Sequence, residues 1–165
     1  MTWSADAIRK RALFDGWLAA HLDFLVPLAS AGEEIDRRTV QARLTSLVGR
    51  QQAPEYVYVL LERRPAEMTP AYIGKALSPR ERWTQHLIGL ARGTGSYARW
   101  RTRLLREGHE SVRFDLQLLV VGEPQVQFPP IPDFPMTIGA VEYQLVGLAA
   151  DAYPLRLLNH EGQTR

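Results

Sequence analysis

The chain has 165 residues, of which 45% are hydrophobic and 23% charged, and it contains no cysteine. These values are typical of a globular domain with one core, and no apolar run approaches the roughly 20 residues of a membrane-spanning helix. The first residues carry charges where a signal peptide needs an uninterrupted apolar segment. We therefore expect no disulfide, no membrane association and an intracellular, cytoplasmic setting.

The charge is unevenly distributed although the net charge is only +2. Residues 56–115 hold 11 lysines and arginines against 6 aspartates and glutamates, whereas residues 116–165 hold 2 against 5. A locally basic surface suits a polyanion such as nucleic acid. Solvated arginines on helix faces would give the same count.

Residues 1–54 are predicted to form a helical N-terminal extension. Apolar residues at helical spacing behind Ser4 predict one long helix over residues 4–28, which Pro27 ends. A second helix is predicted from Asp36 or Thr39 to Gly49, and the two would form a helical hairpin. This part contains no catalytic constellation, so DNA binding, contact with a protein partner and self-association all stay open for it.

Two strands are predicted next. Tyr56–Leu61 mixes aromatic and β-branched residues, so that Tyr58 shares one face with its neighbours two positions away. A turn, ERRPAEMTPA, leads to a second strand, AYIGKAL, over residues 71–77. Gly74 lies near the end of that strand, where a missing side chain lets another backbone or a phosphate approach closely.

A helix is predicted to start at SPRE, residues 78–81, which supplies a capping serine, a proline at the first helical position and a glutamate three residues after the serine. Arg82 and His86, four residues apart, share one face of this helix. After a flexible break at 93–96, residues 97–106 are predicted to form the most basic helix. From it, Arg99 and Arg103 are candidate phosphate contacts.

The last part predicts a strand, a rigid loop and a helix. Residues 111–123 are apolar on both faces, as in a central strand. Five prolines between residues 122 and 135 prevent any regular element before Thr137. A helix from Thr137 to Ala150 carries Glu142, and Asn159 follows an apolar leucine pair. This order of elements predicts a fold that contains both helices and strands (α/β in the broad sense) and belongs to the α+β class.

Residues 55–165 are predicted to form one domain, and the motifs of about residues 56–165 resemble those of the GIY-YIG nuclease superfamily. They are YVY, then YIGK, an arginine and a histidine ten and fourteen residues after the YIG tyrosine, a basic helix, an apolar strand, an AVEYQLV helix and LLN. The resemblance implies a small three-stranded antiparallel sheet flanked by helices, which agrees with the predicted order. It also implies a metal-dependent endonuclease that hydrolyses phosphodiester bonds of DNA.

The resemblance assigns roles to named positions. The implied catalytic residues are Tyr58, Tyr72, Arg82, His86 and Glu142, with Glu142 as the metal ligand. Lys75 matches the residue after YIG and Asn159 the asparagine near the end of the domain, so both join Gly74, Arg99 and Arg103 as candidate substrate-binding residues.

The chemistry of phosphodiester hydrolysis explains why these residue types belong together. The reaction needs a nucleophilic water, a cation that offsets the phosphate charge and stabilisation of the leaving oxygen. Glu142 is a hard oxygen ligand for one Mg²⁺ or Mn²⁺, and Arg82 can bind a phosphate with two parallel donors. Tyr58 would be the general base or would orient the water, and Tyr72 would bond the phosphate or polarise the same water.

Alternatives remain for the residues and for the function. Taken singly, the tyrosines also fit ordinary sheet positions, His86 a surface or capping position and Glu142 a solvated helix position. A nucleic-acid-binding module that keeps the fold but cuts poorly is one alternative function, and a toxin-like or defence nuclease is another. Repair intermediates, branched DNA, a restriction site and foreign DNA are all compatible substrates.

Overall fold

The computed structural model describes residues 4–159 and has an α+β fold, which confirms the predicted class. A four-stranded sheet in the order β1-β4-β2-β3 forms its centre, and every neighbouring pair is antiparallel. The strands are β1 (Leu25–Ala29), β2 (Tyr56–Arg63), β3 (Met68–Ala76) and β4 (Asp115–Gly122). The sheet therefore has one strand more than the sequence predicted.

The additional strand, β1, lies where a long helix was predicted. Helix α1 (Ala5–Ala20) ends before His21, and a 3₁₀ helix, η1 (Leu22–Phe24), leads directly into β1. The apolar residues before Pro27 satisfy a strand as well as a helix, and pairing with β4 decides between them. Pro27 is tolerated because β1 is an edge strand, where a missing N–H need not interrupt the sheet.

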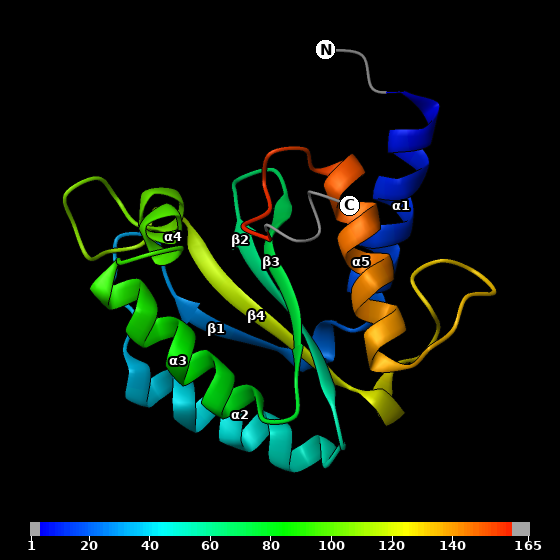
Figure 1. Cartoon of the computed structure of the whole chain (residues 1–165), viewed down its shortest axis with the longest axis horizontal. Coiled ribbons are helices and arrows are strands. Elements are labelled where there is room, and N and C mark those ends of the chain that lie inside the picture. Colours follow the sequence, from blue (N-terminus) through cyan, green and yellow to red (C-terminus); the bar gives the residue numbers. More distant parts are fainter. Residues whose placement is uncertain (1–3, 160–165) are drawn as a thin grey trace.

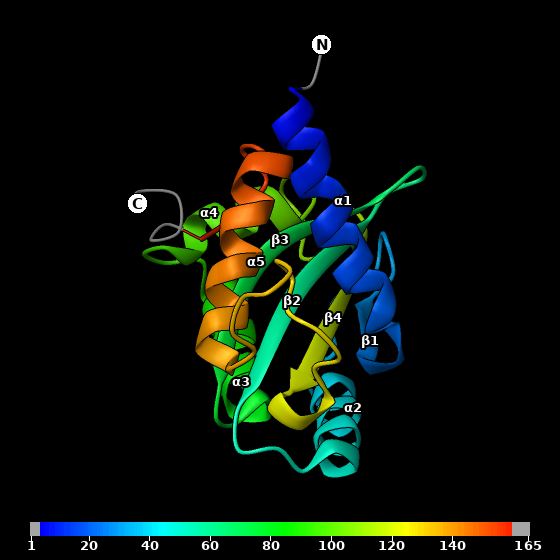
Figure 2. The same cartoon turned by 90° about the vertical axis from the view of Figure 1, so that its right-hand side faces the viewer.

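Helices cover both faces of the sheet (Figures 1 and 2). Helix α1 lies beside α5 (Ile138–Ala152) on one face, and α2 (Arg37–Gln51), α3 (Pro79–Arg92) and α4 (Tyr97–Leu104) lie on the other. The two N-terminal helices therefore do not form the predicted hairpin, because each buries its apolar side on a different face. A second 3₁₀ helix, η2 (Glu123–Gln125), lies within the proline-rich stretch and corrects the prediction of no regular element before Thr137, because Pro124 is compatible with the first turn of a helix.

Strand β2 is buried on both faces. Tyr58 and Leu60 pack toward α2 and α3, whereas Val57 and Val59 pack toward α1 and α5, which confirms the alternation expected from the sequence. The predicted start of α3 is also confirmed, since the Ser78 side chain accepts a hydrogen bond from the Glu81 amide. Between residues 4 and 159, no helix has the length and apolar character needed to cross a membrane.

Candidate active site

The candidate site is built on the close approach of Tyr58 to Gly74. The two residues are directly opposite each other on β2 and β3. A Cβ at residue 74 would lie 2.4 Å from the Tyr58 hydroxyl oxygen, so only glycine lets the phenol ring lie across β3. The space at Gly74 is thus filled by Tyr58, and the prediction that Gly74 contacts substrate gives way to a structural role.

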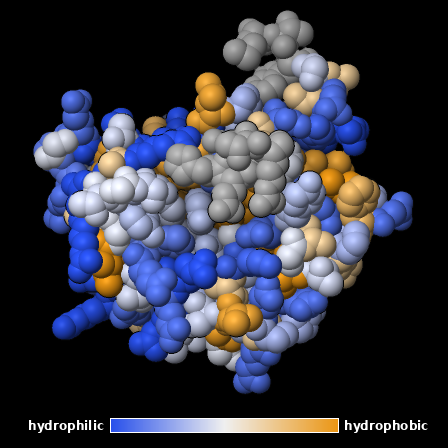
Figure 3. Space-filling view, viewed as in Figure 1, coloured by the Kyte–Doolittle hydropathy of each residue, from blue (hydrophilic) through white to orange (hydrophobic). Residues whose placement is uncertain are grey.

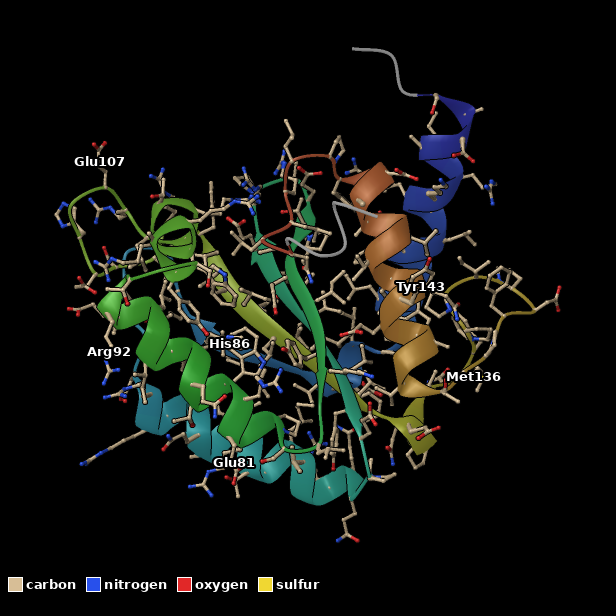
Figure 4. All side chains as sticks on the ribbon, viewed as in Figure 1. Glu81, His86, Arg92, Glu107, Met136 and Tyr143 are labelled. Atoms are coloured by element: carbon tan, nitrogen blue, oxygen red, sulfur yellow. The ribbon has the colours of Figure 1, made fainter. Side chains whose placement is uncertain are left out.

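Tyr72 and His86 lie next to Tyr58. The ring centroids of Tyr58 and Tyr72 are 6.1 Å apart in a stacked arrangement, and Tyr58 Oη is 3.3 Å from His86 Nε2. Figure 4 shows His86 extending from α3 toward β3, away from the solvent-facing side that carries Glu81. β3 is the second edge strand of the sheet, and these three side chains gather beside it.

Arg82 and Glu142 reach the same place from α3 and α5. The exposed guanidinium of Arg82 acts through its charge on the hydroxyls of Tyr58 and Tyr72. The half-buried carboxylate of Glu142 acts electrostatically on the same two tyrosines. The structure therefore brings together the five residues that the sequence singled out as catalytic, from β2, β3, α3 and α5.

Burial controls the protonation of this group. It raises the pKa of Tyr58 far above the ordinary range, and the negative charge of Glu142 adds to the shift while Arg82 opposes it. Burial raises the pKa of Tyr72 in the same way. Burial, helped by the charge of Arg82, lowers the pKa of His86 to about 4. Both phenols and the imidazole are consequently neutral near pH 7.

Tyr97, at the start of α4, is a member of the site that the sequence did not indicate. Its hydroxyl lies 2.8 Å from Nδ1 of His86, so the imidazole is held between two tyrosines. The ring of Tyr97 packs on Gly89, where a Cβ would lie 2.2 Å from it. A glycine inside a helix is costly unless packing requires it, and Gly89 was therefore the one available signal.

A cleft of about 310 Å³ opens beside this group. It is lined by Tyr72, His86, Ser96, Tyr97, Trp100, Leu158 and Asn159. Figure 3 shows that hydrophilic residues predominate on the face of the molecule seen in Figure 1, with hydrophobic residues scattered among them. The candidate site thus adjoins a hollow.

Asn159 supports β3 from outside the sheet. Its amide oxygen accepts a hydrogen bond from the Ile73 amide at 2.9 Å, and its amide nitrogen donates to the Ile73 carbonyl at 2.6 Å. The side chain pairs with β3 as one residue of a neighbouring strand would, immediately after Tyr72. Both ends of its amide bond Ile73, so Asn159 positions the strand. It also lines the cleft described above, and its contact with substrate stays a prediction.

Two predicted phosphate contacts on α4 are used within the protein. Arg103 lies 3.1 Å from the carboxylate of Glu62, which is only 1% exposed, and it also donates to the Leu155 carbonyl. Arg99 is exposed and donates to the Leu157 carbonyl at 3.1 Å. Arg103 therefore neutralises a buried charge instead of facing DNA, and Arg99 ties α4 to the C-terminal segment.

Lys75 lies on the opposite face of β3 from Tyr72, since successive residues of a strand alternate. Its ammonium group is 3.7 Å from the carboxylate of Glu55 and close to Gly139 in the first turn of α5. The side chain is 48% exposed, so the distant ion pair leaves the ammonium accessible to solvent. Lys75 flanks the group of five residues and does not contact Tyr58.

The ligands that a divalent metal ion requires can be compared with the donor groups of the site. Among residues 4–159 there is no group of three or more histidine, aspartate and glutamate side chains that could hold a metal ion. Glu142 is the carboxylate that acts on both site tyrosines. Mg²⁺ keeps several waters and binds through one or two carboxylates together with substrate phosphates. The residues present fit an ion of that largely hydrated kind.

Comparisons of the chain with family models, with curated proteins and with solved structures gave no match.

Proposed function

We propose that the chain is a metal-dependent endonuclease that hydrolyses phosphodiester bonds of DNA with one Mg²⁺ or Mn²⁺ ion. The observation that carries the proposal is the convergence of Tyr58, Tyr72, Arg82, His86 and Glu142 beside β3. The resemblance of the motifs in residues 55–165 to the GIY-YIG nucleases supports the same reaction. These residues also occur along the chain in the same order as the corresponding motifs of that superfamily.

Arg82 binds the scissile phosphate in this proposal. Its guanidinium is exposed, and a planar guanidinium offers two parallel donors to two phosphate oxygens. Tyr72 is half-buried beside it and donates its hydroxyl proton to a phosphate oxygen. These two groups fix the phosphate over the edge of β3.

Tyr58 orients the attacking water. An unperturbed phenol is ionised in only about one molecule in 1,000 at pH 7, and burial of Tyr58 lowers that fraction further. A phenolate base is therefore disfavoured in the resting protein. The neutral hydroxyl oxygen of Tyr58 instead accepts a hydrogen bond from the water and aligns the water with phosphorus.

Glu142 would hold the metal ion. When bound, a divalent ion supplies positive charge that offsets the charge on the phosphate and makes a nearby water more acidic. The chain's own contribution is to place one carboxylate next to the two tyrosines and to keep the phosphate on Arg82. In the reaction, the bond from the water oxygen to phosphorus forms while one phosphorus–oxygen ester bond breaks, the attacking water loses a proton to solvent and the leaving oxygen takes up a proton from solvent.

Plasmid cleavage tests this proposal. Supercoiled DNA is incubated with the parent protein and Mg²⁺ or Mn²⁺, and with Glu142→Ala and Tyr58→Phe. We expect each substitution to reduce cleavage by about 100-fold or more, because each removes a group that acts on the reacting atoms. Glu107→Ala and Tyr56→Phe are matched controls, since Glu107 lies on the exposed loop after α4 and the Tyr56 hydroxyl bonds Ala53.

Two results would refute the proposal. One is a parent protein that cuts neither duplex, branched nor single-stranded DNA with either metal. The other is normal cleavage by both Glu142→Ala and Tyr58→Phe.

A further inference from the structure

We propose that Tyr97 is a positioning residue that sets where the proton resides on His86 and thereby the direction of the Tyr58 hydroxyl. In this arrangement Nδ1 of His86 carries the proton and donates it to Tyr97 Oη. Nε2 accepts the hydroxyl proton of Tyr58. The effect on DNA cleavage rests on the proposed function, whereas the proton position on His86 is a property of the protein by itself.

The imidazole of His86 is fixed in place by its neighbours. Its side chain is 8% exposed, and its ring stacks on Trp100 with centroids 4.9 Å apart. Trp83 packs edge-on at the same centroid distance. The ring nitrogens meet Tyr58 at 3.3 Å and Tyr97 at 2.8 Å. A ring packed in this way is hindered from turning over, so the position of the proton on its two nitrogens sets the direction of its hydrogen bonds.

The available donors and acceptors select one of the two tautomers. The cationic guanidinium of Arg82, which can only donate hydrogen bonds, acts on Tyr58 Oη through its charge. A proton on Nε2 would make the Tyr58 oxygen an acceptor for His86 and would turn the Tyr58 proton away from the imidazole. A proton on Nδ1 gives the Tyr58 hydroxyl an acceptor in Nε2. All three groups then have a partner, as buried polar groups require.

Tyr97 is suited to accept the proton from Nδ1. Its ring is held between Gly89 and Trp100, with the tryptophan centroid 5.2 Å away. The residue is only partly buried and lines the open cleft, so its own hydroxyl proton can be donated to solvent. The direction of hydrogen bonding is thus Tyr58 to His86 to Tyr97 to water.

This direction matters for the proposed reaction. With its proton donated to His86, Tyr58 presents an oxygen lone pair toward the edge of β3 and can accept a hydrogen bond from the attacking water. With the opposite tautomer, Tyr58 would have to donate a proton toward the site instead. Loss of the Tyr97 hydroxyl leaves Nδ1–H without an acceptor, and burial of an unsatisfied donor favours the Nε2–H tautomer.

The test is ¹⁵N NMR of the histidine rings in the parent, Tyr97→Phe and Tyr56→Phe proteins near pH 7. His21 is an internal reference, because its Nδ1 lies 2.7 Å from the Trp17 carbonyl and its Nε2 accepts the Gln127 amide at 3.1 Å. It must therefore be the Nδ1–H tautomer. We expect His86 to match His21 in the parent and in Tyr56→Phe, and to become Nε2–H in Tyr97→Phe.

Cleavage kinetics supply the second measurement. Tyr97→Phe is expected to lower kcat by about tenfold or more at unchanged KM. An Nε2–H tautomer in the parent, or an unchanged tautomer in Tyr97→Phe, would overturn the inference. If the parent cuts no DNA, the proposed function fails while the NMR result still decides the role of Tyr97.

Discussion

The phenol ring of Tyr58 lies so close to Gly74 that a Cβ on residue 74 would stand 2.4 Å from the phenol oxygen. The two residues occupy facing positions on β2 and β3. The two residues therefore depend on each other. The missing side chain of Gly74 leaves room for the Tyr58 ring, and the ring fills that space. The tyrosine of the first motif and the glycine of the second act as one structural unit.

Gly74→Ala is expected to displace the Tyr58 hydroxyl from His86. We predict that cleavage falls at least as far as in Tyr58→Phe and that the free energy of unfolding falls by about 1–3 kcal/mol, because the added methyl group overpacks a buried site. Plasmid cleavage and urea unfolding measure the two effects. Gly147→Ala is the matched control, since nothing lies within 4 Å of a Cβ there and alanine favours the helix. Wild-type behaviour of Gly74→Ala would contradict the assignment.

Arg103→Ala is expected to destabilise the fold without a specific effect on DNA. The substitution removes the closest cation from Glu62, which is almost fully buried, and Arg64 at 3.5 Å remains as the other partner. Breaking a buried pair from one side typically costs about 3 kcal/mol. Urea unfolding should show this loss, whereas Arg92→Ala, on the exposed end of α3 (Figure 4), should change stability by less than about 0.5 kcal/mol. Equal stability of the two variants would argue against the structural role.

Asn159→Ala is expected to loosen β3 beside Tyr72. The substitution removes both hydrogen bonds to Ile73, worth about 1 kcal/mol each. Amide hydrogen exchange should therefore become faster at Ile73, while the amide of Leu60 in the centre of the sheet should be little affected. Leu155→Ala is the control because Leu155 is 92% exposed. An unchanged exchange rate at Ile73 would show that Asn159 does not hold the strand.

Stability is expected to fall in mild acid because of His86. Its pKa is lowered from 6.5 to about 4 by burial and by Arg82, and the other groups that face it, Tyr58 and Tyr97, are neutral there. Between these pH values the unfolded chain binds a proton that the folded protein does not, so the free energy of unfolding decreases as the pH falls. The full difference is about 3 kcal/mol.

Urea unfolding from pH 7 to pH 4 measures this dependence, with His86→Gln as the comparison. The variant should be less stable at pH 7 but should lose less stability on acidification. The buried His21, whose pKa burial also lowers, contributes to the slope in both proteins. Identical slopes would contradict a buried, neutral His86.

Local patterns predicted those parts of the fold and the site that depend on neighbouring residues. The start of α3 could be predicted because the capping signal occupies only four consecutive residues. Strand β2 could be predicted because its side chains alternate between the two faces of the sheet. The grouping of Arg82 with His86 follows from helical spacing alone. Glu142 was placed with them only through the resemblance, because nothing local connects α5 to β3.

The features that were missed all depend on contacts between distant segments. Residues 25–29 form a strand because β4 is available to pair with them. Arg103 was read as a phosphate contact because the sequence does not show that it meets the buried Glu62. The sequence places Tyr97 only at the start of a helix. Its contact with His86 depends on the packing of α4 against α3, which the sequence does not show.

The pairing of β1 with β4 also orders the assembly of the sheet. β2 and β3 are joined by a short turn, so their hairpin closes a small loop. The pairing of Val26 with Leu118 instead joins residues that are far apart in the sequence. Closing a long loop costs more chain entropy and slows folding. During synthesis β1 leaves the ribosome well before its partner exists. The hairpin that joins Tyr58 to Gly74 can therefore form first, and the sheet is completed last, at the edge opposite the site.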